Sequence, residues 1–132
     1  GHLMVFQTPH YVQRLEGVEI VNFGQQGRLG RYPVHIHLCE DLTGSVVRNN
    51  VVRDSNQRCY VGHGTGNMLW EGNIGFDVVG HCFFLEDGSE MGHVYRKNIA
   101  LGMRFPDRLL DHLSGRKETD FEPSAFWISN PK

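Results

Sequence analysis

The chain has 132 residues, which suits one domain, and it carries 16 glycines, 8 histidines and a formal net charge of −2. A sequence pI near 6.5 excludes nucleic acid as the main partner, because such a partner requires a basic surface that displaces counterions from phosphates. No apolar run approaches the roughly 18–20 residues that a membrane span needs, so no membrane span is expected.

The first predicted element, residues 1–14, is a scar and N-terminal lead-in, because its opening GHLM resembles the remnant of a cloning site. From residue 15 onward the chain repeats itself. A short β-rich block recurs at residues 15–20, 45–52, 67–74 and 92–99. An asparagine recurs before a β-branched residue in the last three copies, as Asn50, Asn73 and Asn98. We expect Gly17 to take this position in the first copy, because glycine and asparagine both tolerate the left-handed backbone of a turn.

A second apolar block recurs at residues 32–37, 58–63 and 81–86, and a last one lies at residues 125–129. A charged insertion is expected before this last block, at about residues 105–123. Short β-rich blocks between Gly, Asn and Asp turns, at a period of 20–25 residues, are typical of a solenoid of β-coils. The sequence therefore predicts an all-β fold, a parallel β-helix over residues 15–132. We expect about four coils, truncated at both ends, and end-to-end self-association through the open ends.

Stacking the repeats aligns three polar side chains in one column. These are His37, His63 and Glu86. Neighbouring coils of a β-helix lie one strand spacing apart, about 4.8 Å. His35 precedes His37 by two residues and is expected to point to the same side, while Asp41 and Asp87 lie just past the strand ends.

Three interpretations of this column stay open. Two imidazoles and a carboxylate (His37, His63 and Glu86) form a common ligand set for zinc or non-haem iron. Alternatively, Glu86, Asp87 and Asp41 are the carboxylates of metal-free acid–base catalysis on a sugar, with the histidines as proton carriers. In the third interpretation the column is a polar ladder that only satisfies turn backbone.

Arg31 directly precedes the first histidine block and has two interpretations of its own. Its guanidinium can form a bidentate pair with the carboxylate of an acidic sugar. It can equally neutralise Glu40 or Asp41 a few residues further along the chain.

Four segments occur in a specific order and spacing: GRYPVHIH at residues 30–37, HGT at 63–65, GHCFFLEDG at 80–88 and FWISNP at 126–131. Together they resemble the β-helix region of the G8-domain family. This group contains the cell-migration-inducing hyaluronan-binding protein, transmembrane protein two and the fibrocystin-like proteins. The resemblance runs from about residue 15 to residue 131.

The resemblance implies a right-handed parallel β-helix in an extracellular or secreted protein that is associated with hyaluronan binding or depolymerisation. It also implies which residues occupy the polar motif positions of the family. These are Arg31, His35, His37, Asp41, His63, Glu86 and Asp87. The G8 domain is absent from this sequence, and the loop after Asp41 is shorter than in the animal hyaluronan-degrading members, so the substrate's identity and length stay open.

The leading hypothesis is a polysaccharide-active β-helix that binds or depolymerises a hyaluronan-like acidic glycan, as a hydrolase or a lyase if it is an enzyme. Arg31, His35 and Asp41 would then contact the substrate. Glu86 or Asp87 would protonate the leaving oxygen, while His37 and His63 orient a water or a metal. The alternative is a non-catalytic structural or binding module, stabilised by a divalent cation such as zinc, iron, nickel or calcium.

Overall fold

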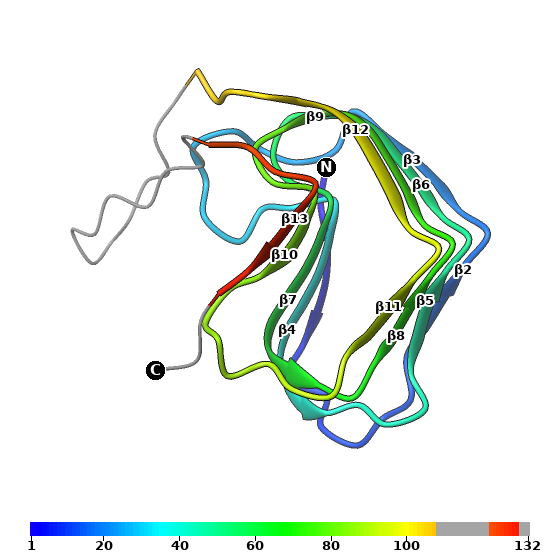
Figure 1. Ribbon diagram of the computed structural model, residues 1–132. Coiled ribbons are helices and arrows are strands. Elements are labelled where there is room, and N and C mark those ends of the chain that lie inside the picture. Colours follow the sequence, from blue (N-terminus) through cyan, green and yellow to red (C-terminus); the bar gives the residue numbers. More distant parts are fainter. Residues whose placement is uncertain (108–121, 130–132) are drawn as a thin grey trace.

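The computed structural model describes residues 1–107 and 122–129. These residues form thirteen strands, and no helix among them is long and apolar enough to cross a membrane. All strand pairs are parallel, and each turn of the right-handed coil adds one strand to every sheet in turn (Figure 1). The predicted parallel β-helix of about four coils is confirmed.

Three sheets make up the walls of the coil. The first contains β1 (Leu3–Phe6), β4 (Val34–Asp41), β7 (Tyr60–Gly66), β10 (Phe83–Leu85) and β13 (Phe126–Ile128). The second contains β2 (Arg14–Glu16), β5 (Val46–Arg48), β8 (Leu69–Glu71) and β11 (Val94–Arg96). The third contains β3 (Glu19–Val21), β6 (Val51–Ser55), β9 (Ile74–Val79) and β12 (Ile99–Arg104). Neighbours within a sheet are always one coil apart in the sequence.

The first coil begins before residue 15. Residues 3–6, which the sequence assigns to the lead-in, form β1 and pair with β4 over their whole length. The reason is the side chain of Val5, which packs against the core and gives this segment an inward apolar contact. The insertion expected at about residues 105–123 falls largely on residues 108–121, outside the described part of the chain.

The core lies inside the coil, where alternate side chains of each strand point inward. In the first sheet Tyr60 stacks on Phe83 and Phe83 stacks on Phe126, with ring centroids 4.8 and 4.7 Å apart. From the second sheet, Tyr95 meets Phe83 edge-on at 6.1 Å. Because this apolar row points inward, the alternate residues of β4, β7 and β10 are left on the outer face.

A ladder of asparagine side chains joins the coils at the turn between the second and third sheets. The Asn50 and Asn73 amides each donate to the side-chain oxygen of the asparagine one coil further, at 3.0 and 3.1 Å. The Asn50 oxygen in turn accepts from the backbone N–H of Val18 at 3.0 Å. Val18, and not Gly17, therefore occupies the asparagine position in the first coil, which corrects the predicted alignment by one residue.

The residue before each ladder position has a left-handed backbone. Its φ lies between 57° and 69° at Gly17, Asn49, Gly72 and Lys97. Glycine and asparagine reach this conformation at low cost, which is why Gly17 aligns with Asn49 instead of Asn50. The turn is two residues long in every coil, so the strands on either side keep their register.

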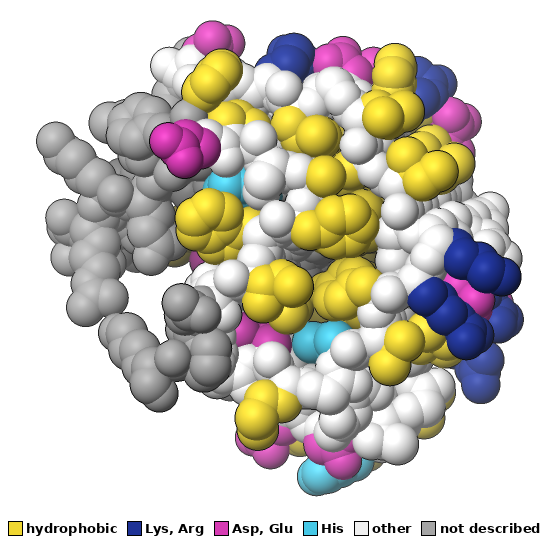
Figure 2. Space-filling model, in the orientation of Figure 1, with side chains coloured by type: hydrophobic (Ala, Val, Ile, Leu, Met, Phe, Trp, Pro, Cys, Tyr) yellow, Lys and Arg dark blue, Asp and Glu magenta, His cyan; other side chains and the backbone are white. Residues whose placement is uncertain are grey.

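Hydrophobic side chains gather in the middle of the face that is seen along the coil axis, and most charged side chains lie near its rim (Figure 2). The three sheets surround the core on its sides, and along the axis each coil is covered by the next coil. The core side chains of a terminal coil are therefore seen at the end face. Self-association through such a face stays a prediction.

Candidate functional site

The outer face of the first sheet carries the side chains that the sequence aligns in a column. β4 and β7 pair with His37 opposite His63, and the Glu86 backbone N–H donates to the Gly62 carbonyl at 3.2 Å, which extends the row to Glu86. Phe6 of β1 continues the row in the other direction and stacks on His37, with ring centroids 5.4 Å apart. We call this region the histidine face. It consists of Phe6, His35, His37, His63, Glu86 and Asp87.

His35 points to the same side as His37, as predicted, but it is buried. Tyr32, in the loop before β4, packs against it with ring centroids 4.8 Å apart, and His35 Nδ1 lies 3.0 Å from the Gly30 carbonyl oxygen. A carbonyl can only accept, so Nδ1 carries the proton and Nε2 presents a lone pair. Burial lowers the pKa of His35 to about 3, although the hydrogen bond to Gly30 raises it. His35 is therefore a neutral imidazole of fixed tautomer.

His37 receives this lone pair. Its Nδ1 lies 3.1 Å from His35 Nε2, and its ring meets the His63 ring edge-on at 4.5 Å between centroids. Burial lowers the pKa of His37, and the nearby His63 acts in the same direction. Three imidazoles from two adjacent strands thus form one contact group.

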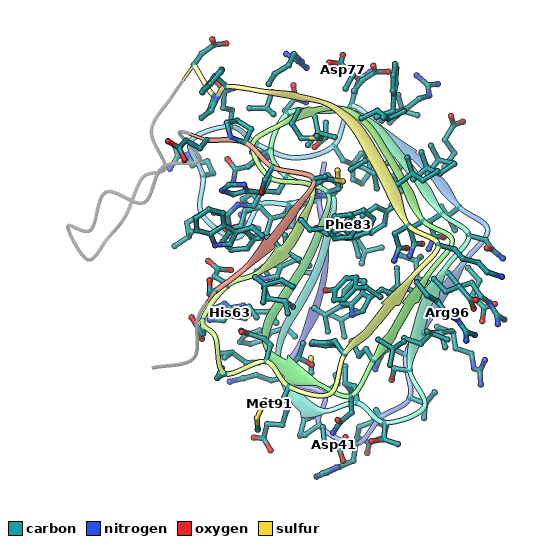
Figure 3. All side chains as sticks on the ribbon, in the orientation of Figure 1. Asp41, His63, Asp77, Phe83, Met91 and Arg96 are labelled. Carbon is teal, nitrogen blue, oxygen red and sulfur yellow. The ribbon has the colours of Figure 1, made fainter. Side chains whose placement is uncertain are left out.

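His63 lies between two carboxylates and is labelled in Figure 3. Its Nδ1 is 3.5 Å from Glu86 Oε2, and its Nε2 is 2.9 Å from Asp87 Oδ2. The Glu86 side chain is only 9% exposed, whereas the Asp87 side chain is 48% exposed. Asp87 is therefore the carboxylate that a solute reaches, and Glu86 holds the other edge of the His63 ring.

Arg58 lies beneath the histidine face and was missed in the sequence. Its side chain is 1% exposed, donates to the Tyr32 hydroxyl at 2.9 Å and lies 3.8 Å from Glu86 Oε1. The guanidinium also covers the Phe84 ring at 3.7 Å from its centroid. Its register was the available signal: two residues before Tyr60, Arg58 aligns with Tyr32 of the previous coil.

Arg31 borders the histidine face. It is exposed, and its guanidinium contacts His2 Nε2 at 2.6 Å. The preceding residue, Gly30, is the one whose carbonyl holds His35. The chain therefore presents a cation at the edge of the three imidazoles.

Asp41 lies at the far end of β4, away from His63 (Figure 3). Its carboxylate accepts hydrogen bonds from the side chains of Asn67 and Thr43 at 2.9 and 2.7 Å. These bonds hold the pKa of Asp41 below its usual range. Asp41 lines a groove of about 280 Å³ that includes no residue of the histidine face. The structure thus does not bring Asp41 together with Glu86.

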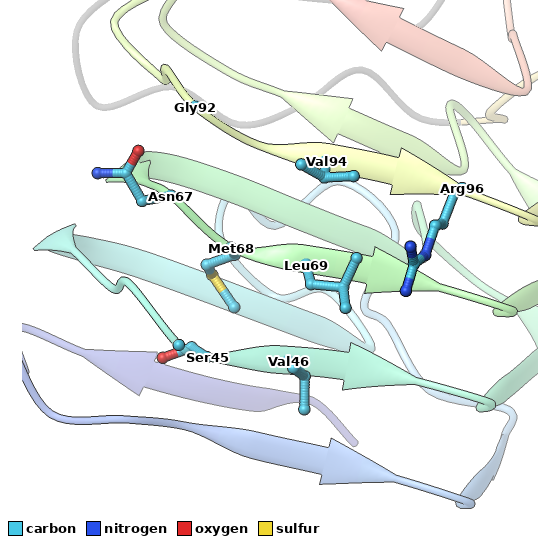
Figure 4. A pocket seen from close by; sticks show the side chains of 9 residues that line it. Ser45, Val46, Asn67, Met68, Leu69, Gly92, Val94 and Arg96 are labelled. Atoms are coloured by element: carbon cyan, nitrogen blue, oxygen red, sulfur yellow. The ribbon is translucent and has the colours of Figure 1, made fainter.

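A second groove, of about 350 Å³, follows β5, β8 and β11 (Figure 4). Its lining is mostly apolar and includes Val46, Leu69 and Val94, with Arg96 among its few polar residues. It contains none of the site residues that the sequence predicts, so the candidate site is the histidine face.

The histidine face supports two kinds of chemistry. A carboxylate beside an imidazole, with one edge open to solvent, can transfer protons to and from a bound solute. Ring nitrogens that converge can also hold a cation, and one nitrogen each of His35, His37 and His63 lie within 4.8 Å of one another. In this second group His35 takes the place that the sequence gives to Glu86.

Comparisons with known proteins place the chain in one family. The family model described as CEMIP beta-helix matches residues 1–132. The chain is 40% identical to fibrocystin-L from Homo sapiens over 89% of its length, and 35% identical to the human cell surface hyaluronidase CEMIP2 over 99%. It is 39% identical to a G8 domain-containing protein from Dictyostelium discoideum over 76%. It spans only 3%, 11% and 7% of these three proteins, respectively.

Proposed function

Because the chain belongs to the CEMIP beta-helix family, we propose that it is part of an extracellular protein that binds a hyaluronan-like acidic polysaccharide and depolymerises it on the histidine face. The relative CEMIP2 is named a cell surface hyaluronidase, which supports both the substrate class and the location. Because the chain spans only 11% of that relative, the extracellular location and the activity of the whole protein are parts of this proposal.

One observation carries the proposal: an exposed carboxylate, Asp87, contacts an imidazole, His63, on a sheet face that a polymer can cross. Arg31 at the edge of this face offers a guanidinium for the carboxylate of an acidic sugar. Phe6, half of whose surface is exposed, offers an apolar ring beside His37. Each part of an acidic sugar thus has a partner of suitable chemistry: Arg31 for its carboxylate, Phe6 for the apolar face of its ring and Asp87 for the glycosidic oxygen.

The roles of the two carboxylates follow from their exposure. Asp87 protonates the leaving glycosidic oxygen, a step that hydrolysis and elimination both need, and His63 exchanges the proton with it. Glu86, largely buried beside Arg58, positions His63 through its Nδ1 edge. The proposal therefore selects Asp87 over Glu86 as the acid.

The test is incubation of the chain with hyaluronan, alginate, pectin and neutral dextran, with and without added divalent cations. Polymer length is followed by size-exclusion chromatography with light scattering, and binding by retention on immobilised polymer. We expect hyaluronan to be retained and shortened, and dextran to be neither. Retention without shortening would overturn the enzymatic part and leave a binding module, while loss of both would overturn the whole proposal.

A substitution of Asp87 tests whether this residue takes part in the reaction. Asp87→Asn should lower the rate of shortening by about 10²–10⁴-fold, the usual contribution of a positioned acid, while retention of the polymer persists. Asp77→Asn on β9 is the matched control, since Asp77 is a surface carboxylate on the third sheet, where it pairs with Arg104. Equal rates for Asp87→Asn and Asp77→Asn would remove Asp87 from the mechanism.

A further inference from the structure

We propose that His35, His37 and His63 together bind one divalent transition-metal ion of the zinc, cobalt or nickel class. The site consists of three residues of the proposed glycan surface, but its ligands are nitrogen atoms of this chain and need no polysaccharide to bind a cation. Calcium is not the expected ion, because it takes oxygen ligands, whereas imidazoles suit the later first-row metals and zinc.

The spacing of the nitrogen atoms supports such an ion. Ligand atoms that lie about 2.0–2.1 Å from a tetrahedral zinc ion are about 3.4 Å from one another. His35 Nε2 and His37 Nδ1 are 3.1 Å apart, close to this value. The third nitrogen, from His63, completes a group in which all separations are within 4.8 Å. Because the His37 and His63 rings are only half-buried, rotation about their side-chain torsions can close the remaining distance, which is at most about 1.4 Å.

The surroundings of His35 fit a ligand. A metal-bound histidine usually donates its other ring N–H to a carbonyl or carboxylate, which fixes the tautomer and aims the free nitrogen at the ion. His35 Nδ1 makes this bond to Gly30, and Tyr32 holds the ring from one side. The backbone of β4 and the loop before it therefore hold one ligand in place before any ion arrives.

Without a metal, the His37 Nδ1–H donates to His35 Nε2, and an ion bound here would replace the proton of this hydrogen bond. His35 Nε2 and His37 Nδ1 face each other directly, and Asp87, which carries an exposed carboxylate, lies beside His63. A cation at this point would meet three ring nitrogen atoms, with a carboxyl group beside them. The site is thus open to solvent on the Asp87 side and closed on the His35 side.

The experiment titrates the chelator-treated chain with Zn²⁺ and Co²⁺. Isothermal titration calorimetry measures stoichiometry and affinity, and the visible absorption of Co²⁺ reports nitrogen coordination. We expect one ion per chain, and a loss of affinity of at least about 10–100-fold in His37→Gln and in His63→Gln. Both side chains reach the surface, and circular dichroism verifies that each variant folds. His10→Gln, at an exposed histidine of the loop after β1, is the control and should bind as the parent does.

Three results would overturn the proposal: no stoichiometric ion, unchanged affinity in His37→Gln and His63→Gln, or a loss of binding in His2→Gln equal to theirs. The last result would assign the ion to the N-terminus. Binding is measured without polysaccharide, and polymer shortening is measured separately in chelator. The cation site and the glycan function can therefore each fail while the other stands.

Discussion

The outer faces of the first and second sheets each present a row of side chains, one from every coil, but the two rows differ in chemistry. In the second sheet the outer row alternates in charge. It consists of Glu16, Arg48, Glu71 and Arg96, in register on β2, β5, β8 and β11. Arg48 pairs with Glu16 at 2.6 Å and Arg96 with Glu71 at 2.7 Å. We call this row the charge ladder; on the histidine face the corresponding row combines imidazoles, carboxylates and an aromatic ring.

The difference lies in what is buried. The side chains of the charge ladder reach solvent, so its ion pairs contribute little to stability and mainly disfavour a shifted register. The histidine face includes a buried imidazole, His35, and a buried guanidinium, Arg58, lies beneath it. Ionisable groups in such positions cost free energy unless every one is paired, and they cluster at functional sites for this reason. The comparison thus supports the proposal that function lies on the first sheet, whereas the second sheet mainly keeps the register.

The largest expected effect comes from Arg58→Ala, which leaves Glu86 and the Tyr32 hydroxyl without this partner. Breaking a buried pair by removing one member costs roughly 3–5 kcal/mol of unfolding free energy. Urea unfolding followed by tryptophan fluorescence measures the loss. Arg48→Ala in the charge ladder is the control, and a loss no larger than that of Arg48→Ala would show that the two faces do not differ in this respect.

The free energy of unfolding, measured as a function of pH, distinguishes the contribution of a buried histidine from that of the carboxylates in the charge ladder. Burial lowers the pKa of His93, although its hydrogen bond to Thr65 and the charge of Glu90 raise it, and its Nδ1 accepts from the Trp70 indole at 3.1 Å. The unfolded chain therefore binds the additional proton. Stability should fall as the pH drops below the unfolded value of about 6.5, by at most about 1.4 kcal/mol per pH unit for this group.

The ladder should add nothing to this loss in the same range. Hydrogen bonds from Arg48 and Arg96 hold the pKa of Glu16 and Glu71, respectively, below the usual range, so both stay charged down to pH 5. Urea unfolding at pH 7.5, 6 and 5 tests this. His93→Gln should make the profile less steep, and His35 and His37, whose pKa values burial also lowers, should account for the slope that remains. Glu16→Gln should leave the slope unchanged; the reverse pattern would contradict the assignment.

The smallest effect is expected from Arg48→Gln in the charge ladder. The guanidinium and its partner Glu16 are exposed, and solvent and salt screen their attraction. The midpoint of thermal unfolding should therefore change little, and 1 M NaCl should remove the difference from the parent chain. A large, salt-resistant loss would mean that the ladder is more than a register device.

The fold and the central column were predictable because both depend on spacing along the chain. The asparagines at Asn50, Asn73 and Asn98 mark the same turn of successive coils, and their side chains bond one another as stacked turns require. A parallel β-helix converts a fixed spacing into a fixed neighbour. This is why the row of His37, His63 and Glu86 follows from the sequence.

The features that the sequence did not predict depend on local geometry, which the spacing of residues along the chain does not determine. The pairing of β4 with β7 is shifted between His37 and Glu40, and this irregularity moves Asp41 to another corner of the coil. Spacing aligns Arg58 with Tyr32 of the previous coil, but it does not show that the two side chains are buried and hydrogen-bonded to each other. Gly17 was misaligned by one residue because only the bond from Val18 to Asn50 distinguishes the two turn positions.

The constant turn between the second and third sheets has a consequence for how such a protein can diversify. It always has two residues, at 17–18, 49–50, 72–73 and 97–98, whereas the segments that enter the first sheet differ in length, from residues 22–33 in one coil to residues 56–59 in the next. Insertions at that corner leave lateral pairing intact, because the entropy cost of a longer surface loop grows slowly. New loops can therefore accumulate along the border of the histidine face and change the surroundings of its side chains while the scaffold stays the same.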